Sequence, residues 1–208
     1  MKHTINFKYN RKKIIFENLE IEIPENKITV ICGHNGAGKT TLLKILSGIF
    51  PSKNDENLKK VKGWLVPASG GLIRHFSLKE HLDIIKAEKN TSWQEAFSLF
   101  QAETFEKTPV RKLSTGQEMM ASIVVACASN SEFIYLDEPF ASLDPNNAEN
   151  LVKILKNLGK TVVVTSHDLY LTTEVADKIL FIKDGKISWQ TENQLDVEEL
   201  KTAYKDFA

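Results

Sequence analysis

Cysteine is scarce in this sequence, and long apolar runs are absent. Only Cys32 and Cys127 occur among 208 residues, far apart and each in an apolar stretch. Such a pair indicates two buried thiols in a reducing compartment rather than a disulfide framework or a metal site. The longest apolar runs, such as residues 123–128, are much shorter than the roughly 20 residues that cross a bilayer. Because the N-terminus also has no apolar signal core, we expect a cytoplasmic protein that reaches a membrane only through a partner.

An excess of charge of either sign is also missing. Lys+Arg and Asp+Glu both number 27, so the formal net charge is zero. A chain that binds nucleic acid needs a basic face, and we therefore expect no nucleic acid partner. The remaining composition, 42% hydrophobic and 26% charged, is ordinary for a globular protein, and the length is sufficient for one sizeable core.

The order of apolar residues predicts an α/β fold. Polar and apolar residues alternate over parts of 3–23, which predicts antiparallel strands, and the continuous apolar run 28–32 predicts a strand buried on both faces. Strands and helices then alternate along the chain, with strands predicted at 61–66, 133–136, 161–165, 179–182 and 186–189 and a final helix from Asp196.

Residues 69–112 differ in character from the segments on either side. Two capping-box patterns, beginning at Ser77 and Ser92, each predict the start of an amphipathic helix. We therefore predict a single domain over 1–208, in which a core with an antiparallel β-subdomain (1–68 and 113–208) carries a short inserted helical subdomain. Plain crossover helices between strands are the alternative reading.

The segment GHNGAGKT, from Gly33 to Thr40, fits the phosphate-loop pattern G-x-x-x-x-G-K-[ST] between a strand and a helix. Its glycines let backbone N–H groups converge on an anion, and the following helix adds its positive N-terminal end. Lys39 supplies a charge for the β- and γ-phosphates, and the Thr40 hydroxyl suits Mg²⁺. The sequence therefore predicts a P-loop NTPase core that binds Mg-ATP through Asn35, Gly36, Ala37, Gly38, Lys39, Thr40 and Thr41.

Two further strand ends carry candidate catalytic groups. The apolar strand 133–136 ends in Asp137-Glu138, where Asp137 suits Mg²⁺ and Glu138 suits a general base that polarises the attacking water. The strand 161–165 is followed by His167, which can bond the γ-phosphate or that water. The plain structural alternatives are a strand-end acid that caps the next turn and a histidine that is merely a satisfied polar group.

Five motifs now stand in order: the phosphate loop, LSTGQ, YLDEP, ASLD and TSHD. In this order they resemble the nucleotide-binding subunits of ATP-binding-cassette (ABC) transporters, over nearly the whole chain. By this resemblance, LSTGQ stands for the family's signature motif. In that family the signature of one subunit covers the ATP held by the phosphate loop of another. The resemblance therefore implies that Ser114, Gly116 and Gln117 contact ATP in trans, within a homodimer or a pseudo-dimer with a second cassette.

The resemblance implies two more site residues and exposes one departure. Asp144 matches the loop that crosses the dimer interface in the family, and Tyr9 falls where the family has an aromatic ring stacked on adenine; the alternative for Tyr9 is an ordinary alternating strand residue. The family's glutamine that contacts Mg²⁺ falls here on Pro67 or Ala68. Neither can hold a metal, so Ser69 or a water would have to substitute.

The function implied is an ATPase subunit that powers an ABC transporter together with separate transmembrane permease subunits, at the inner face of the cell membrane. The short helical subdomain favours export. The alternatives are a cassette ATPase that acts outside transport, and a nucleotide sensor with little turnover in which the lost glutamine has left binding alone. The sequence does not identify the transported substrate or the membrane partner.

Overall fold

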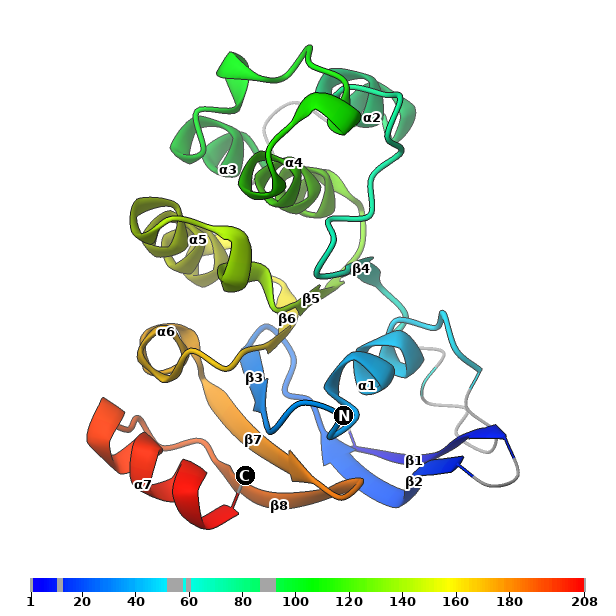
Figure 1. The fold of residues 1–208 in the computed structure, drawn as a ribbon, viewed down its shortest axis with the longest axis vertical. Coiled ribbons are helices and arrows are strands. Elements are labelled where there is room, and N and C mark those ends of the chain that lie inside the picture. The colour runs from blue at the N-terminus through cyan, green and yellow to red at the C-terminus, as the bar shows by residue number, and fades with distance from the viewer. Residues whose placement is uncertain (1, 11–12, 52–57, 59–60, 87–92, 208) are drawn as a thin grey trace.

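The computed structural model describes residues 2–10, 13–51, 58, 61–86 and 93–207. Within them, β1 and β2 form a two-stranded antiparallel sheet, and a larger sheet has the strand order β4-β5-β6-β3-β7-β8 (Figure 1). The strands are β1 (Lys2–Asn10), β2 (Lys13–Glu22), β3 (Ile28–Cys32), β4 (Trp64–Val66), β5 (Phe133–Asp137), β6 (Thr161–Thr165), β7 (Lys178–Lys183) and β8 (Lys186–Thr191).

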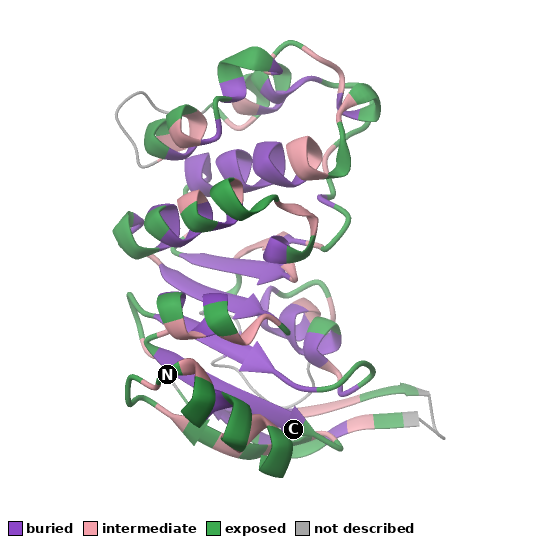
Figure 2. Ribbon diagram, turned by 60° about the vertical axis from the view of Figure 1, so that its left-hand side comes forward, coloured by how far each residue is buried: buried purple, intermediate pink, exposed green. Residues whose placement is uncertain are grey.

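The larger sheet is parallel from β4 to β7, and only β8 runs antiparallel, as the hairpin partner of β7. Every residue of β3, β5 and β6 is buried (Figure 2). Such strands read as unbroken apolar runs because helices cover both of their faces. In a parallel sheet the carboxyl ends of the strands meet at one edge, and Cys32, Asp137 and Thr165 all end there.

The described residues form seven α-helices. They are α1 (Lys39–Leu46), α2 (Leu78–Ile84), α3 (Trp93–Leu99), α4 (Thr115–Ala128), α5 (Pro145–Asn157), α6 (Leu169–Val175) and α7 (Val197–Phe207), with short 3₁₀ turns at Ala102–Thr104, Val110–Lys112 and Pro139–Ser142. Of these helices, α2 and α3 pack on α4 rather than on the sheet (Figure 1). None of the helices in this described part is long and apolar enough to cross a membrane.

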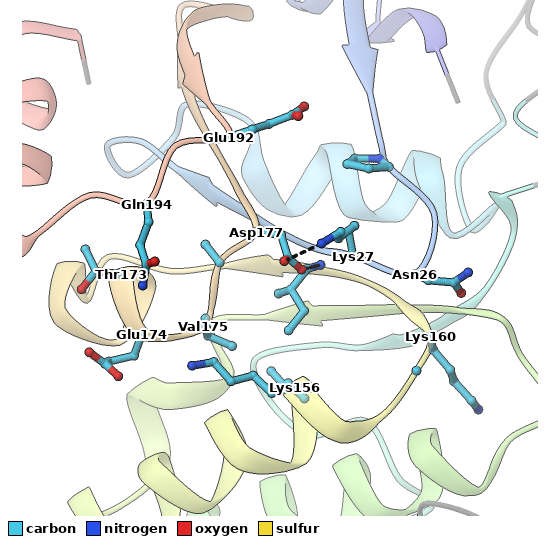
Figure 3. A pocket seen from close by; sticks show the side chains of 15 residues that line it. Asn26, Lys27, Lys156, Lys160, Thr173, Glu174, Val175, Asp177, Glu192 and Gln194 are labelled. Carbon is cyan, nitrogen blue, oxygen red and sulfur yellow. Dashed lines mark hydrogen bonds and ion pairs between the residues drawn. The ribbon is translucent and has the colours of Figure 1, made fainter.

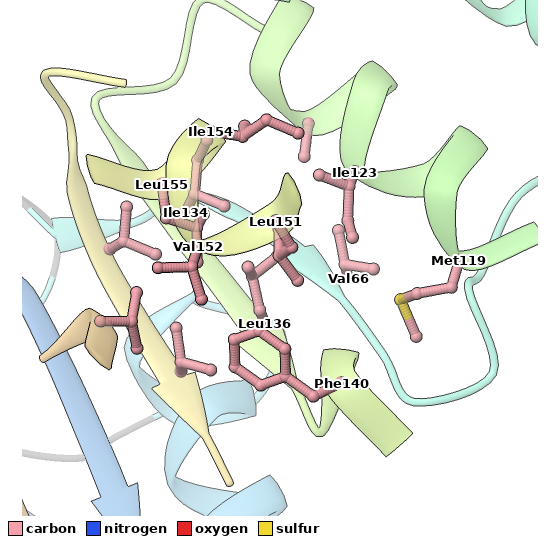
Figure 4. Close-up of a cluster of buried hydrophobic side chains, with 14 of the residues drawn as sticks. Val66, Met119, Ile123, Ile134, Leu136, Phe140, Leu151, Val152, Ile154 and Leu155 are labelled. Atoms are coloured by element: carbon pink, nitrogen blue, oxygen red, sulfur yellow. The ribbon is translucent and has the colours of Figure 1, made fainter. Parts of the chain in front are cut away.

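Two hydrophobic clusters lie on opposite faces of the sheet. Alternate residues of β5 divide between them: Phe133 and Tyr135 join the cluster with α1 and the β1–β2 pair, whereas Ile134 and Leu136 join the cluster with α4 and α5. The second cluster contains Met119, Ile123 and Leu151 (Figure 4) and continues to Leu78 and Phe100 in the α2–α3 region. One continuous core therefore joins the sheet to the helical segment, and the division into subdomains stays a prediction.

One expected element differs in detail, and another lies outside the described residues. The strand expected at 61–66 is paired only from Trp64. The backbone of Gly63 lies close to Phe133, since an added Cβ would lie 2.2 Å from the Phe133 carbonyl oxygen. The capping box expected at Ser92 falls outside the described residues. The one at Ser77 is present, with reciprocal bonds between Ser77 and Glu80 at the start of α2. His81 on this helix is a satisfied polar group, since Nε2 accepts from the Ile73 N–H and Nδ1 donates to the Ser77 carbonyl.

Candidate nucleotide site

The phosphate loop connects β3 to α1 at the carboxyl edge of the sheet. Gly36 and Gly38 have φ values of 87° and 102°, which other residues adopt only with strain. Gly38 occupies the N-cap of α1 and makes no side-chain cap bond, so the first N–H groups of the helix stay available to an anion. Lys39 is 8% exposed, and its Nζ donates to the Gly33 carbonyl at 2.7 Å. The loop is thus folded around its own lysine.

Asp137, at the end of β5, joins the loop to the sheet. Its Oδ2 accepts from the Thr40 hydroxyl at 2.8 Å, and the residue is only 5% exposed. No cluster of three or more His, Cys, Asp or Glu side chains suited to a metal occurs among the described residues. One carboxylate and one hydroxyl beside a phosphate loop fit Mg²⁺, which is usually bound by one or two carboxylates together with substrate phosphates and waters.

Glu138 lies directly after β5 in the left-handed region, with φ 49° and ψ 47°. Its Oε1 is 3.8 Å from the Nζ of Lys39, and its Oε2 is 2.8 Å from Nδ1 of His167. Because an ionised carboxylate only accepts, Nδ1 of His167 donates this bond. The side chain of His167 is 66% exposed. A carboxylate, an ammonium and an imidazole from three segments therefore converge above the phosphate loop.

Lys39 and Glu138 line a cavity of about 330 Å³, whereas His167 is not among its lining residues. At its outer end Tyr9 is 49% exposed, its hydroxyl lies 2.9 Å from Thr41 Oγ1, and its ring meets those of Phe7 and Phe50 edge-on. Ile15 and His34 also line the cavity, and neither was predicted. Ile15 can be recognised as a lining residue only after β1 and β2 have paired, because its sequence pattern is that of any strand residue. The cavity's full lining is Tyr9, Ile15, His34, Asn35, Gly36, Gly38, Lys39, Thr40, Thr41, Asp137 and Glu138.

Cys32, which precedes the loop, is a packing residue. It is fully buried, and this burial raises the pKa of its thiol to about 12. Cys127 is also buried and free, with its pKa raised to about 12 for the same reason. Thiols with such values are inert near neutral pH. The expectation of two buried, unpaired cysteines is confirmed.

The signature (residues 113–117) lies beside the loop that contains Asp144, and neither segment lines the cavity. Ser114 is the N-cap of α4 and forms a capping box with Gln117. A Cβ on Gly116 would lie 2.8 Å from the carbonyl oxygen of Ser142, so a glycine is required where the two segments meet. Asp144, exposed, caps α5 through the N–H of Asn147. Gly116 therefore lies against the loop that contains Asp144, and Ser114, Gly116, Gln117 and Asp144 are not among the residues that line the cavity at the chain's own phosphate loop.

The segment that lacks the family's glutamine is a tight turn. The Gly70 N–H donates to the Pro67 carbonyl at 2.8 Å, and Ala68 and Ser69 between them are exposed. Gly70 packs against Glu118 of α4, since a Cβ there would lie 2.7 Å from that side chain. None of these residues lines the cavity.

A second cavity, of about 500 Å³, lies at the amino edge of the parallel strands (Figure 3). Its charged groups are largely paired with other protein groups. Lys27 bonds Asp177 at 3.1 Å, and Nζ of Lys160 donates to the carbonyls of Cys127 and Ser129 at the end of α4. The polar groups suited to phosphate are therefore concentrated at the opposite edge, around Lys39.

Comparison with known proteins agrees with this arrangement. The family model described as "ABC transporter" matches residues 16–141. The chain belongs to the ABC transporter family. It is 30% identical to the energy-coupling factor transporter ATP-binding protein EcfA of Carboxydothermus hydrogenoformans, over 88% of this chain and 77% of that protein. It is also 30% identical to the L-arabinose transport ATP-binding protein AraG of Geobacillus stearothermophilus, but covers only 39% of that protein's length.

Solved ABC cassettes share the fold. One ATP-binding subunit of an ABC transporter aligns with a TM-score of 0.82 at 16% identity, over 98% of both chains. A dimeric bacterial ABC transporter cassette aligns at 0.75 and 23% identity, over 91% of this chain and 97% of that one. The family and fold class expected from the sequence are thereby confirmed. The chain is an ATP-binding subunit of a family whose members are ATPases.

Proposed function

We propose that this chain binds and hydrolyses Mg-ATP and that the hydrolysis powers transport by separate transmembrane permease subunits at the inner face of the cell membrane. The observation that carries the proposal is the convergence of Lys39, Glu138 and His167 above the phosphate loop. Glu138 accepts the proton of the attacking water, and His167 donates from Nδ1 to Glu138, which fixes the direction of that carboxylate. Lys39 leaves the Gly33 carbonyl to neutralise the β- and γ-phosphates.

Thr40 and Asp137 are the residues that would hold Mg²⁺. A bound Mg²⁺ neutralises charge on the phosphate oxygens. Backbone N–H groups of residues 35–41 bind the phosphates themselves, and Tyr9 stacks on the adenine at the outer end of the cavity. Because the Tyr9 ring is held edge-on by Phe7 and Phe50, it presents an aromatic face of fixed orientation.

The second half of the ATP site comes from another cassette in this proposal. Ser114, Gly116 and Gln117 are partly or fully exposed and lie away from the chain's own cavity, which fits a role in trans across a homodimer or a pseudo-dimer. Asp144 lies in the same group and would cross the interface. A formal net charge of zero gives no reason to expect a basic face that would bind nucleic acid. We therefore propose no nucleic acid partner.

Export is the direction favoured by the short helical segment, as expected from the sequence. That direction stays a prediction, because the relatives include proteins named for L-arabinose transport and for manganese transport. The transported substrate depends on the permease subunits. Affinity purification of the tagged chain from gently solubilised membranes, with companions identified by mass spectrometry, tests this part: recovery without any multi-span protein would contradict it.

The dimer and the general base are tested together with Glu138→Gln. We expect this variant to bind ATP, to lose hydrolysis and to run as a dimer in size-exclusion chromatography only when ATP is present. Glu174→Gln is the matched control, because Glu174 is an exposed carboxylate at the opposite edge of the sheet. A Glu138→Gln variant that still hydrolyses ATP at the wild-type rate would contradict the assignment of the base, and one that stays monomeric at high concentration would contradict the dimer.

A nucleotide sensor with little turnover is the second candidate, favoured by Ala68 in the exposed turn where the family has glutamine. Ala68→Gln separates the two. A gain in Mg²⁺-dependent turnover would mean that the missing oxygen limits the natural chain. An unchanged rate, in a chain that already turns over ATP, would mean that water or Ser69 substitutes.

A further inference from the structure

Thr165 is the last residue of β6, two positions before His167, and it is completely buried. Its hydroxyl donates to Oδ1 of Asp137 at 2.8 Å. The hydroxyl oxygen of Thr165 also accepts from the backbone N–H of Glu138 at 2.9 Å. A hydroxyl has one proton and two lone pairs, so it makes both bonds at once. One side chain therefore bonds the two consecutive acidic residues of the site.

The bond to Asp137 determines how that carboxylate is oriented. Asp137 and Thr165 are register partners on adjacent parallel strands, and their side chains point to the same face. With Oδ1 held by Thr165, Oδ2 is the oxygen left to bond Thr40. Rotation of the Asp137 carboxylate would break both bonds. The bond from Thr165 therefore determines which direction Oδ2 faces, towards the phosphate loop.

The bond to Glu138 supports a backbone conformation that is unfavourable for glutamate. Glu138 has φ 49° and ψ 47°, and non-glycine residues adopt the left-handed region at a cost in free energy. The turn directs the Glu138 carboxylate towards Lys39 and His167 rather than along the strand. The hydroxyl of Thr165 gives the Glu138 N–H a partner in this conformation.

We propose that Thr165 is a positioning residue for ATP hydrolysis, which orients the metal-binding carboxylate of Asp137 and the general base Glu138 through one hydroxyl. The inference rests on the proposed function for the roles of those two acids. The hydrogen bonds on which it rests do not depend on the dimer, because every group involved belongs to one chain. Threonine suits the position better than serine, because its branched Cβ restricts the rotation of χ1.

The matched control is on the neighbouring strand. Thr29, on β3, is also completely buried, and its hydroxyl oxygen has no hydrogen-bond partner. Threonine and valine have nearly the same shape, so Thr165→Val and Thr29→Val remove one hydroxyl each from the same sheet. The first leaves the Asp137 oxygen and the Glu138 N–H without their partner, whereas the second leaves no group unpartnered.

The experiment measures the affinity for a fluorescent ATP analogue in EDTA and in Mg²⁺, and separately the rate of ATP hydrolysis. For Thr165→Val we expect affinity in EDTA within about twofold of wild type, a roughly tenfold loss of the gain in affinity that Mg²⁺ gives, and at least a roughly tenfold lower kcat. Thr165→Ser should recover most of both, within about threefold of wild type. Thr29→Val should equal wild type in all three measurements.

A Thr165→Val variant with the wild-type Mg²⁺ dependence and rate would overturn the proposal, and so would equal losses in Thr165→Ser and Thr165→Val. Thermal unfolding establishes that each variant is folded, and Thr165→Ala replaces the valine variant if the latter loses its cooperative transition. If the wild-type chain hydrolyses no ATP, the proposed function fails, but the Mg²⁺-dependent binding comparison still decides whether Thr165 orients Asp137.

Discussion

Two helices of this chain begin at motifs assigned to ATP, and their N-termini are built differently. At α1 the N-cap is Gly38, in the left-handed region, and no side chain bonds the free N–H groups. At α4 the N-cap is Ser114, whose hydroxyl accepts from the Gln117 N–H while the Gln117 side chain accepts from the Ser114 N–H. One N-terminus has no side-chain cap, and the other is partly occupied by its own capping box.

If both motifs contact ATP as we propose, this difference indicates how the two halves of the site can be kept apart in a single chain. The first N–H groups of α1 have no side-chain cap, so phosphate oxygens can bond them in place of water. At the N-terminus of α4 the Gln117 N–H is already bonded to Ser114, and an anion can replace that bond only by displacing the cap. We therefore expect α1 to bind ATP in the isolated chain and α4 to contribute only when a second cassette brings ATP to it.

The largest expected effect removes the charge at the N-terminus of α1. Lys39→Ala should weaken ATP binding by at least roughly 100-fold, because charge-assisted bonds to the phosphates are lost. Equilibrium binding of ATP to the purified chain measures it. If the affinity for ATP is unchanged, the loop is not the phosphate site, and the difference between the N-termini of α1 and α4 does not bear on ATP binding.

A smaller effect is expected where the signature meets the Asp144 loop. Gly116→Ala places a Cβ 2.8 Å from the carbonyl oxygen of Ser142, which should force the two segments apart at about 1–3 kcal/mol. We expect ATP binding to the single chain to persist and ATP-dependent dimer formation by the Glu138→Gln protein to fall. Loss of binding and dimer together would mean that α4 is not separate from the α1 site.

The capping box itself can be opened with Ser114→Ala. Loss of an N-cap side chain should lower stability by about 1 kcal/mol, which corresponds to roughly 2–4 °C in Tm for a chain of this size. The affinity of the single chain for ATP should not change. Thermal unfolding and ATP binding are measured side by side, and a change in affinity without a change in Tm would contradict the separation of the two N-termini.

The smallest effect concerns α5, whose N-cap Asp144 is charged. Bonds from the backbone N–H and side chain of Asn147 hold the pKa of Asp144 below its ordinary 3.8. A lowered pKa in the folded chain stabilises the fold above 3.8, and this stabilisation is lost as pH falls through the lowered value. Because asparagine also caps helices, the difference in Tm between wild type and Asp144→Asn should be small at neutral pH. The difference should shrink below pH 3.8, as Asp144 loses its charge. A Tm difference that stays constant with pH would mean that the charge of Asp144 does not contribute to stability.

Much of the fold could be predicted from local sequence patterns. The strand 161–165 was predicted with its observed bounds, and the helix starts at Ser77, Ser114 and Asp144 follow from capping residues that bond their own helices. These features depend on neighbours within a few residues, which a sequence displays directly. The strand at 61–66 was predicted too long because its extent depends on pairing with β5, a distant part of the chain.

For the site, the sequence by itself determined which groups are present: a glycine loop with Lys39 and Thr40, the acids Asp137 and Glu138, and His167. Only the tertiary structure decided their connections. Thr165 was treated as a strand residue, and its two bonds to the acids require that β5 and β6 be adjacent and in register. The separation of Gly116 from the phosphate loop likewise depends on how helices pack over the sheet. Motifs specify chemistry through residue type, whereas orientation depends on side chains brought together from distant parts of the chain.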